Sequence, residues 1–294
     1  MKRTSGGRTM ALGMALAALA VAAAPGGAAA QGTDSLTRNA SASATVDVDA
    51  GSADVTIVAG RGDRVVVRGD RDDMGRVRLE GSPDRVLVRA EGADDRLEIR
   101  VPRGASLQAR TRSGNLEVRG ISGDIELESS SGDFRVEGAS RHLRIEGVSG
   151  DVRVTGTPTG VRISTVSGDV TVGRVKGVVG VSTASGDVEV DADGVSNGRF
   201  EAGSGSLHFR GAVSPDASLD FQTASGDVTI GLPEDTGATY EVTTVSGEMV
   251  TDRKARLVGG QHFGGGRQYE LSIGDGSVRV TVQAVSGTVR IERP

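Results

Sequence analysis

The sequence contains no cysteine and no tryptophan, and it has only five phenylalanines and two tyrosines. Without cysteine the chain has no disulfide framework, no thiolate nucleophile and no cysteine-ligated zinc or iron–sulfur cluster. With so few aromatic rings it also lacks the platforms on which sugar-cleaving enzymes usually stack their substrates. Proline is scarce, at seven of 294 residues, which excludes a collagen-like chain. Stability must therefore come from packing and hydrogen bonds.

Long hydrophobic runs are missing as well, apart from one near the start of the chain. Residues 1–30 combine the basic residues Lys2, Arg3 and Arg8 with an apolar run over residues 10–24 and a small-residue end at residues 28–30. This order predicts a secretory signal peptide that is cleaved near Ala30. The run is shorter than the roughly 20 residues that a membrane-spanning helix needs. We therefore expect an exported protein without a membrane span, whether periplasmic, cell-surface or extracellular.

Positive charge is in deficit. Removal of the three basic residues of the leader from the total of 34 leaves 31 Lys and Arg against 39 Asp and Glu, a net charge of −8. A protein with this balance has no general electrostatic attraction to nucleic acid or to anionic lipid surfaces. No nucleic-acid partner is expected.

Glycine, by contrast, is abundant at 45 of 294 residues, and valines alternate with polar residues over long stretches. The glycine content disfavours helices, and the alternation is typical of strands with one buried face, so an all-β chain is predicted. The dipeptide Ser-Gly recurs ten times in the mature chain, and aspartate follows it six times. The serines of these copies are Ser113, Ser122, Ser131, Ser149, Ser167, Ser185, Ser204, Ser225, Ser246 and Ser286.

The spacing of these copies predicts the architecture. Positions 113, 131, 149, 167 and 185 are 18 residues apart, and two short strands fill each interval. Stacked coils pair such strands with the coils above and below and bury one continuous core. We predict a parallel β-solenoid (β-helix) of about ten coils over residues 106–294, with Ser-Gly-Asp at its corners. The interval of 40 between positions 246 and 286 is expected to hold two coils of about 20 residues.

The segment before the repeats needs a different interpretation. Residues 43–105 are rich in strands but lack the 18-residue spacing, and glycine-containing turns such as residues 60–63 favour antiparallel hairpins. Because the end of a solenoid is an unpaired sheet edge, this segment is predicted to be an antiparallel N-terminal β cap. Residues 31–42, rich in Ser, Thr and Ala, are predicted to be a linker. No helix is expected after the leader.

Small hydroxyl side chains are the first candidate functional groups. Counting inward by twos from the corners places Ser129, Thr165, Thr183, Thr223 and Thr244 inside the coils. They are expected to fill a narrow corner and to form hydrogen bonds to one another, because no histidine accompanies them as a catalytic base. The three histidines, His142, His208 and His262, lack metal-ligand spacing.

The aspartates of the corners are the second candidates. Asp133, Asp151, Asp169 and Asp187 would lie about 5 Å apart in successive coils and repel one another by about 0.8 kcal/mol per pair. Calcium would relieve this repulsion, since stacked oxygen ligands suit it. Neighbouring arginines would relieve it too, because two pairs recur at the same spacing of 18, and ordinary solvation of an aspartate in a turn needs no ion at all. These pairs are Arg135 with Arg153, and Arg144 with Arg162.

Several motifs together resemble a known family. They are the alternating segment over residues 46–57, the Val-Pro-Arg-Gly-Ala-Ser-Leu junction at 101–107, the serial Ser-Gly-Asp corners, Gly-Leu-Pro at 231–233 and Ala-Val-Ser-Gly at 284–287. The chain resembles the exported bacterial β-strand-repeat family of unknown function that is labelled putative adhesin. The resemblance implies a β-solenoid, a location in the cell envelope or outside the cell, and no established enzymatic activity.

These observations lead to one functional expectation and two alternatives. The expected protein is an exported, non-enzymatic, structural or adhesin-like envelope protein that presents a repetitive solenoid surface to a protein or polysaccharide partner, without a cofactor. The first alternative is a calcium-stabilised binding module. The second is a polysaccharide-active β-helix enzyme, although no acid pair can be assigned among the repetitive carboxylates.

Overall fold

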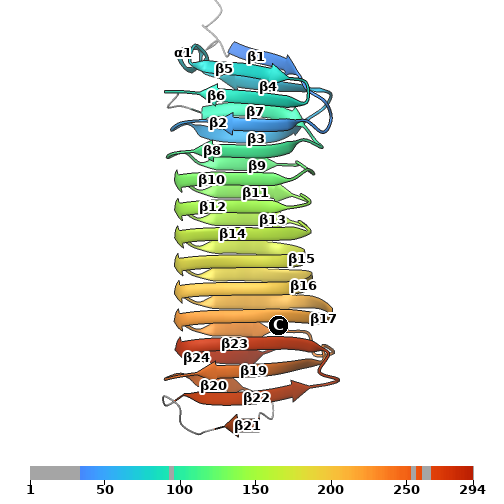
Figure 1. Cartoon of the computed structure of the whole chain (residues 1–294), viewed down its shortest axis with the longest axis vertical. Helices are drawn as coiled ribbons and strands as arrows, with labels where there is room; N and C mark the ends of the chain where they lie inside the picture. Colours follow the sequence, from blue (N-terminus) through green and yellow to red (C-terminus); the bar gives the residue numbers. More distant parts are fainter. Residues whose placement is uncertain (1–33, 93–95, 253–255, 260–265, 294) are drawn as a thin grey trace, which may run out of the picture. The chain divides into compact units, whose positions relative to one another are not determined.

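The computed structural model describes residues 34–92, 96–252, 256–259 and 266–293, all within one compact unit, Thr33–Pro294. The predicted signal peptide and His262 lie outside the described residues. The described chain is all-β: it forms 24 strands that belong to one sheet, and its single helix, α1 (Arg71–Met74), has four residues. Most strand pairs are parallel, and the sheet is wound with a solenoid-like curvature (Figure 1). The prediction of an all-β chain is confirmed.

In the middle of the molecule the strands follow one another in sequence order along two rows. Ile125 pairs with Leu143, and Leu143 with Val161, so each pairing joins residues 18 apart as the spacing predicted. The long strands run through a corner and take part in both rows. The strands of the two rows, short and long, are β8 (Ser106–Thr111), β9 (Leu116–Arg119), β10 (Ile125–Ser131), β11 (Phe134–Gly138), β12 (Leu143–Ser149), β13 (Val152–Gly156), β14 (Gly160–Ser167), β15 (Val170–Ser185), β16 (Val188–Ser204), β17 (Leu207–Ser225) and β18 (Val228–Gly231).

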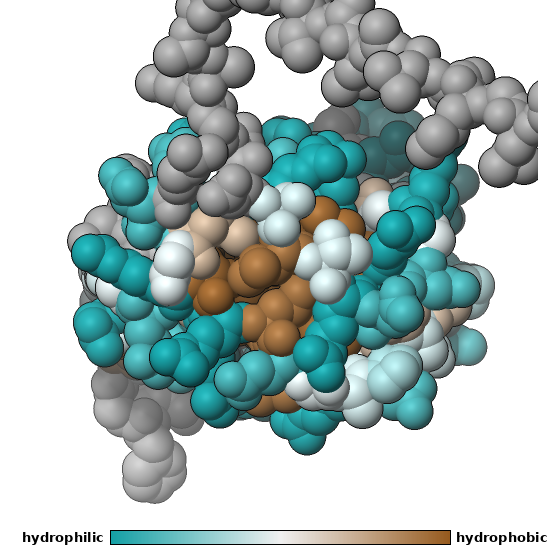
Figure 2. All heavy atoms as spheres, turned by 90° about the horizontal axis from the view of Figure 1, so that it is seen from above, coloured by the Kyte–Doolittle hydropathy of each residue, from teal (hydrophilic) through white to brown (hydrophobic). Residues whose placement is uncertain are grey.

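The core lies between the two rows. Burial alternates along each strand, and the inward positions are mostly valine, isoleucine and leucine. Three stacked phenylalanines, Phe200, Phe209 and Phe221, have ring centroids 4.8–5.8 Å apart and fill the wider coils. Each fully buried side chain of this kind contributes about 1.5–3 kcal/mol of hydrophobic stabilisation. Figure 2, from the end that carries β1, shows hydrophobic residues in the centre and hydrophilic residues around them.

The N-terminal end corrects the prediction of an antiparallel cap over residues 43–105. The strands here are β1 (Asp34–Asn39), β2 (Thr45–Asp49), β3 (Asp54–Gly60), β4 (Arg64–Gly69), β5 (Val77–Ser82), β6 (Arg85–Ala90) and β7 (Arg96–Pro102). β2 is parallel to both β6 and β8, and β3 is parallel to both β7 and β9. Three pairs are antiparallel, namely β1 with β4, β4 with β7 and β5 with β6. β6 and β7 therefore each have one parallel neighbour and one antiparallel neighbour.

Two smaller predictions for this end were also wrong. The predicted linker over residues 31–42 contains β1, whose Leu36 packs against the core while its other side chains remain polar, as suits an edge strand. A one-turn helix, α1, was not expected, but it places Met74 on the core beside Val77. β1 pairs with β4 over six residues, and each of the two segments contributes one apolar side chain to the core, which leaves no periodic pattern in the sequence.

The C-terminal end repeats the arrangement of the N-terminal end. Its strands are β19 (Ala238–Thr244), β20 (Glu248–Thr251), β21 (Arg256–Gly259), β22 (Arg267–Ile273), β23 (Val278–Ser286) and β24 (Thr288–Glu292). β23 lies between β17 and β19, and β24 lies between β18 and β20, so the last coil of the sequence is inserted before the preceding one. β22 then covers β19 in antiparallel fashion. The expected two sequential coils between residues 246 and 286 are not formed.

Candidate binding surface

The corners of the coils are held by contacts between main chains. At Gly168, where φ is +119°, an added Cβ would lie 2.2 Å from the carbonyl oxygen of Gly150 in the preceding coil. Gly150 stands in the same relation to Gly132, with φ +119° and a distance of 2.2 Å. Only glycine allows both this φ and this close approach. The Ser-Gly repeat is therefore required by the packing of successive corners.

The four aspartates that the sequence analysis singled out do come together at this corner, in one ladder. Oδ1 of Asp133 accepts a hydrogen bond of 2.9 Å from the main-chain N–H of Asp151, and Asp151 and Asp169 do the same for the next aspartate along. Asp187 ends the series by accepting from the N–H of Ser206 at 2.7 Å. Each carboxylate thus joins its own coil to the following one.

This ladder explains how the corner tolerates a column of carboxylates. Each negative charge lies against a main-chain N–H dipole, and hydrogen bonds to charged groups are stronger than neutral ones. The predicted relief by neighbouring arginines is not seen, because within the described part of the chain none of these four carboxylates forms an ion pair. Nor do the described residues contain any group of three or more His, Asp or Glu side chains arranged to hold a metal ion.

The inward hydroxyls also lie where the sequence placed them, and they too bond to the main chain. Ser129, Thr165 and Thr183 each donate to the carbonyl oxygen two residues ahead, at 3.0–3.1 Å. Thr244 accepts from the N–H of Gly247 at 2.9 Å. The exception is Thr223, whose buried Oγ1 has no hydrogen-bond partner in the described structure. The expectation that these hydroxyls bond to one another is therefore corrected, since their partners are main-chain groups.

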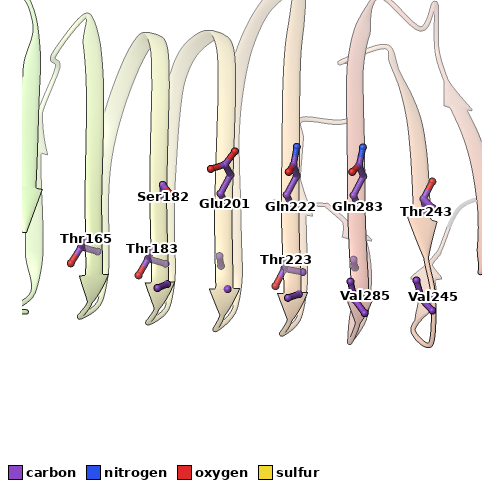
Figure 3. Close-up of a pocket in the computed structure, with 15 residues that line it drawn as sticks. Thr165, Ser182, Thr183, Glu201, Gln222, Thr223, Thr243, Val245, Gln283 and Val285 are labelled. Carbon is purple, nitrogen blue, oxygen red and sulfur yellow. The ribbon is translucent and has the colours of Figure 1, made fainter. Parts of the chain in front are cut away.

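A groove of about 800 Å³ runs beside these hydroxyls across six successive strands (Figure 3). Figure 3 shows Glu201, Gln222 and Gln283 in one row on the outer face and Val285 and Val245 nearer the strand ends. Gln222 pairs in register with Gln283, and Thr223 pairs with Ala284. The groove therefore presents amide groups beside a line of small apolar side chains.

A second recess, of about 580 Å³, lies on the outer face of β12, β14, β15 and β16, and its charged lining residues are Arg144, Arg162, Arg199 and Glu201. Arg144 pairs in register with Arg162, Arg162 with Gly180, and Gly180 with Arg199. Arg144 forms an ion pair with Glu146, and Arg199 forms one with Glu201 at 2.6 Å. The hydrogen bond that Arg199 donates to Glu201, together with the negative charge of Glu201, raises the pKa of Arg199 above its ordinary value.

From the sequence, Arg144 and Arg162 were predicted only to compensate the charge of the aspartates. Arg199 and Gly180 were not predicted to join them, because Arg199 is 19 rather than 18 residues beyond Gly180. The register shifts near Val175 and Gly177 account for this extra residue. The equal spacing of the outward arginines is the feature of the sequence that indicates this row of side chains. Arg199 fits the spacing when one inserted residue is allowed.

The two described histidines have different surroundings. His142 is exposed, with its Nδ1 3.0 Å from Oδ1 of Asp124, and it lines the arginine recess. His208 lines a different depression, together with Glu189 and Arg210. The two histidines thus belong to separate surfaces. Among the described residues, no helix is both long enough and apolar enough to cross a membrane.

Comparisons with known proteins give one family model and several solved structures. The family model described as Toastrack DUF4097 matches residues 33–212 and 175–292. A structure named a putative adhesin, from Bacteroides fragilis, is 10% identical with a TM-score of 0.47 and covers 90% of this chain and 98% of its own. A putative adhesin from Parabacteroides distasonis is 11% identical with a TM-score of 0.45 and covers 89% and 97%.

A third solved structure carries a different name. The protein named a putative lipid binding protein from Parabacteroides distasonis is 10% identical with a TM-score of 0.42, and it covers 88% of this chain and 97% of its own. No curated protein matches the chain.

Proposed function

Since the chain belongs to the Toastrack DUF4097 family, we propose that it is an exported, non-enzymatic, adhesin-like scaffold of the cell envelope. In this proposal the chain is a parallel β-solenoid of about ten coils that holds rows of outward side chains at fixed spacing for a partner to bind. The function lies in these rows and requires neither a cofactor nor turnover of a substrate.

One observation supports this proposal above the others. Successive coils are joined at the corner by main-chain contacts and by the aspartate ladder, so their relative positions do not depend on the outward side chains of the flanks. The flanks can therefore vary in sequence without loss of the fold. A fold that fixes positions and leaves the exposed residues free suits the presentation of a binding surface.

The proposed export rests on residues 1–30, whose basic start, apolar run and small-residue end have the order of a signal peptide. The full chain is expressed with its own leader in a bacterial host, and the protein outside the inner membrane is analysed by mass spectrometry. We expect a mature chain that begins at Gln31. A chain that keeps Met1 and stays in the cytoplasm would contradict this part of the proposal.

The binding function is tested on isolated cell envelopes. We expect saturable binding of the purified chain, together with no release of reducing ends when the same protein is incubated with envelope polysaccharides. Released reducing ends would favour the polysaccharide-active enzyme, the alternative from a different class. A protein that neither binds envelopes nor cleaves polysaccharide would contradict the proposal as a whole.

A further inference from the structure

The recess on the outer face of β12, β14, β15 and β16 lies along a column of charged side chains, that is, of outward residues paired in register from strand to strand. Gly180 interrupts this column. Along the stack the column reads Glu126, Arg144, Arg162, Gly180, Arg199 and Asp220. Basic residues thus occupy three of the four central positions and acidic residues occupy both ends. This order concentrates positive charge in one place on a chain whose net charge is negative.

Gly180 leaves the centre of this column open. A Cβ built at this glycine would meet no atom within 4 Å, and its φ is not in the left-handed region. Packing therefore does not require glycine here, in contrast to the corners. Since neighbouring strands are about 4.8 Å apart, Arg162 and Arg199 flank a gap of roughly 10 Å between their main chains.

Arg162 is the arginine of this recess whose charge is not offset. Within the described residues it forms no ion pair, whereas Arg144 bonds to Glu146 and Arg199 bonds to Glu201. Its neighbours in register are Arg144 and Gly180, and the outward residues on its own strand are Gly160 and Ser164. An exposed guanidinium with its donors free is suited to bind a carboxylate through two parallel hydrogen bonds.

We propose that this recess binds the carboxylates of an acidic polysaccharide that lies along the stack, with Arg162 as the principal contact and Arg199 as the second. The inference rests on the proposed function and specifies the ligand class of one part of the presented surface. A polymer with one carboxylate on each sugar can place acidic groups against both arginines across the open position of Gly180. Val178, which is 58% exposed beside Gly180, offers an apolar contact for a sugar ring.

The surroundings of the recess favour a single chain over a flat anionic surface. Glu126 and Asp220 stand on either side of the basic part of the column, and Glu146 and Glu201 lie in the next column, with Glu201 lining the recess itself. A lipid bilayer would bring its negative charge against all four carboxylates, whereas a narrow chain can follow the basic positions. Vesicles containing phosphatidylglycerol are therefore included in the test as a competing class of ligand.

The experiment measures the affinity of the purified full chain for polygalacturonate oligosaccharides by calorimetry at low ionic strength. We expect Arg162→Gln to weaken binding at least about tenfold, as for the loss of a charged hydrogen-bonded contact. Arg153→Gln is the matched control, because Arg153 is also an exposed arginine that lies beside another, Arg135, and forms no ion pair in the described structure. This control variant should bind like the parent chain.

A second variant tests the open position itself. Gly180→Asp places a carboxylate between the two arginines and should abolish binding, while thermal unfolding of this variant reports that the fold is intact. Equal binding by the parent chain and by Arg162→Gln would overturn the proposal. So would binding to neutral dextran of the same length, or binding to the vesicles without binding to polygalacturonate.

Failure of this inference is distinguishable from failure of the proposed function. If the parent chain binds isolated envelopes but ignores polygalacturonate, the ligand class is wrong and the scaffold function stands. If neither envelopes nor polygalacturonate are bound, both proposals fail.

Discussion

The corner and the flank of the same coils use glycine in opposite ways. At the corner, Gly168 has a positive φ and lies against the main chain of the preceding coil, so no other residue fits. On the flank, Gly180 has open space where a side chain would be, and the residues in register with it are arginines. The repeated corner glycines are required by packing, whereas the glycine that interrupts the arginine column lies at the centre of the proposed binding recess.

The largest expected effect comes from an alanine at the corner. Gly168→Ala would place a Cβ 2.2 Å from the carbonyl oxygen of Gly150 and would hold alanine at a φ of +119°. We expect a loss of at least about 3 kcal/mol in the free energy of unfolding, because backbone strain and overpacking act together. Urea unfolding followed by circular dichroism measures this loss.

The flank supplies the control for this substitution. Gly180→Ala adds the same methyl group where no atom lies within 4 Å. The free energy of unfolding should stay the same or rise by about 0.5 kcal/mol, since alanine restricts the unfolded chain. Similar losses for both variants would mean that the corner and the flank are under the same constraint, contrary to the comparison.

The corner aspartates are expected to contribute less than the glycines. Asp169→Ala removes the acceptor of the 2.9 Å hydrogen bond from the N–H of Asp187, and we expect it to cost about 1 kcal/mol. Asp169→Asn keeps an oxygen at the same place and should cost less than about 0.5 kcal/mol. The chain already has an asparagine in this role, because Oδ1 of Asn115 accepts a hydrogen bond from the N–H of Asp133 at 2.8 Å.

Chemical denaturation of both variants separates the hydrogen bond from the charge. If the asparagine variant is as unstable as the alanine variant, then the charge rather than the acceptor oxygen holds the corner. That result would return attention to cations as partners of the ladder.

The inward hydroxyls offer a third and smaller contrast. Thr183→Val loses the 3.1 Å hydrogen bond to the carbonyl oxygen of Ser185 and should cost about 1 kcal/mol. Thr223→Val, at the equivalent depth, removes a hydroxyl without a partner and should leave stability within about 0.5 kcal/mol or raise it. Thermal unfolding of the two variants gives the comparison, and a larger loss for Thr223→Val would mean that its hydroxyl has a role in the groove.

The repeat allowed the middle of the molecule to be predicted, but the N-terminal end lacks the repeat and the spacing of 40 near the C-terminal end misled. Alternating valines look alike in parallel and antiparallel strands, so the sequence did not reveal that β2 lies between β6 and β8. The order of pairing depends on contacts between distant segments, as it does again where β23 lies between β17 and β19. The corner aspartates were correctly placed in one column, but their partners are main-chain N–H groups, which no residue pattern displays.

The smallest expected effect concerns calcium and the aspartate ladder. Addition of millimolar calcium after EDTA treatment should leave the unfolding temperature of the full chain unchanged, because Oδ1 of Asp133, Asp151 and Asp169 already accepts a main-chain N–H. An ion that bound the folded state alone would raise the unfolding temperature in proportion to the logarithm of its concentration. A rise with calcium but not with magnesium, lost in Asp169→Asn, would make the corner a metal site. The corner would then be a binding surface like the flank, and the distinction between the two regions would no longer hold.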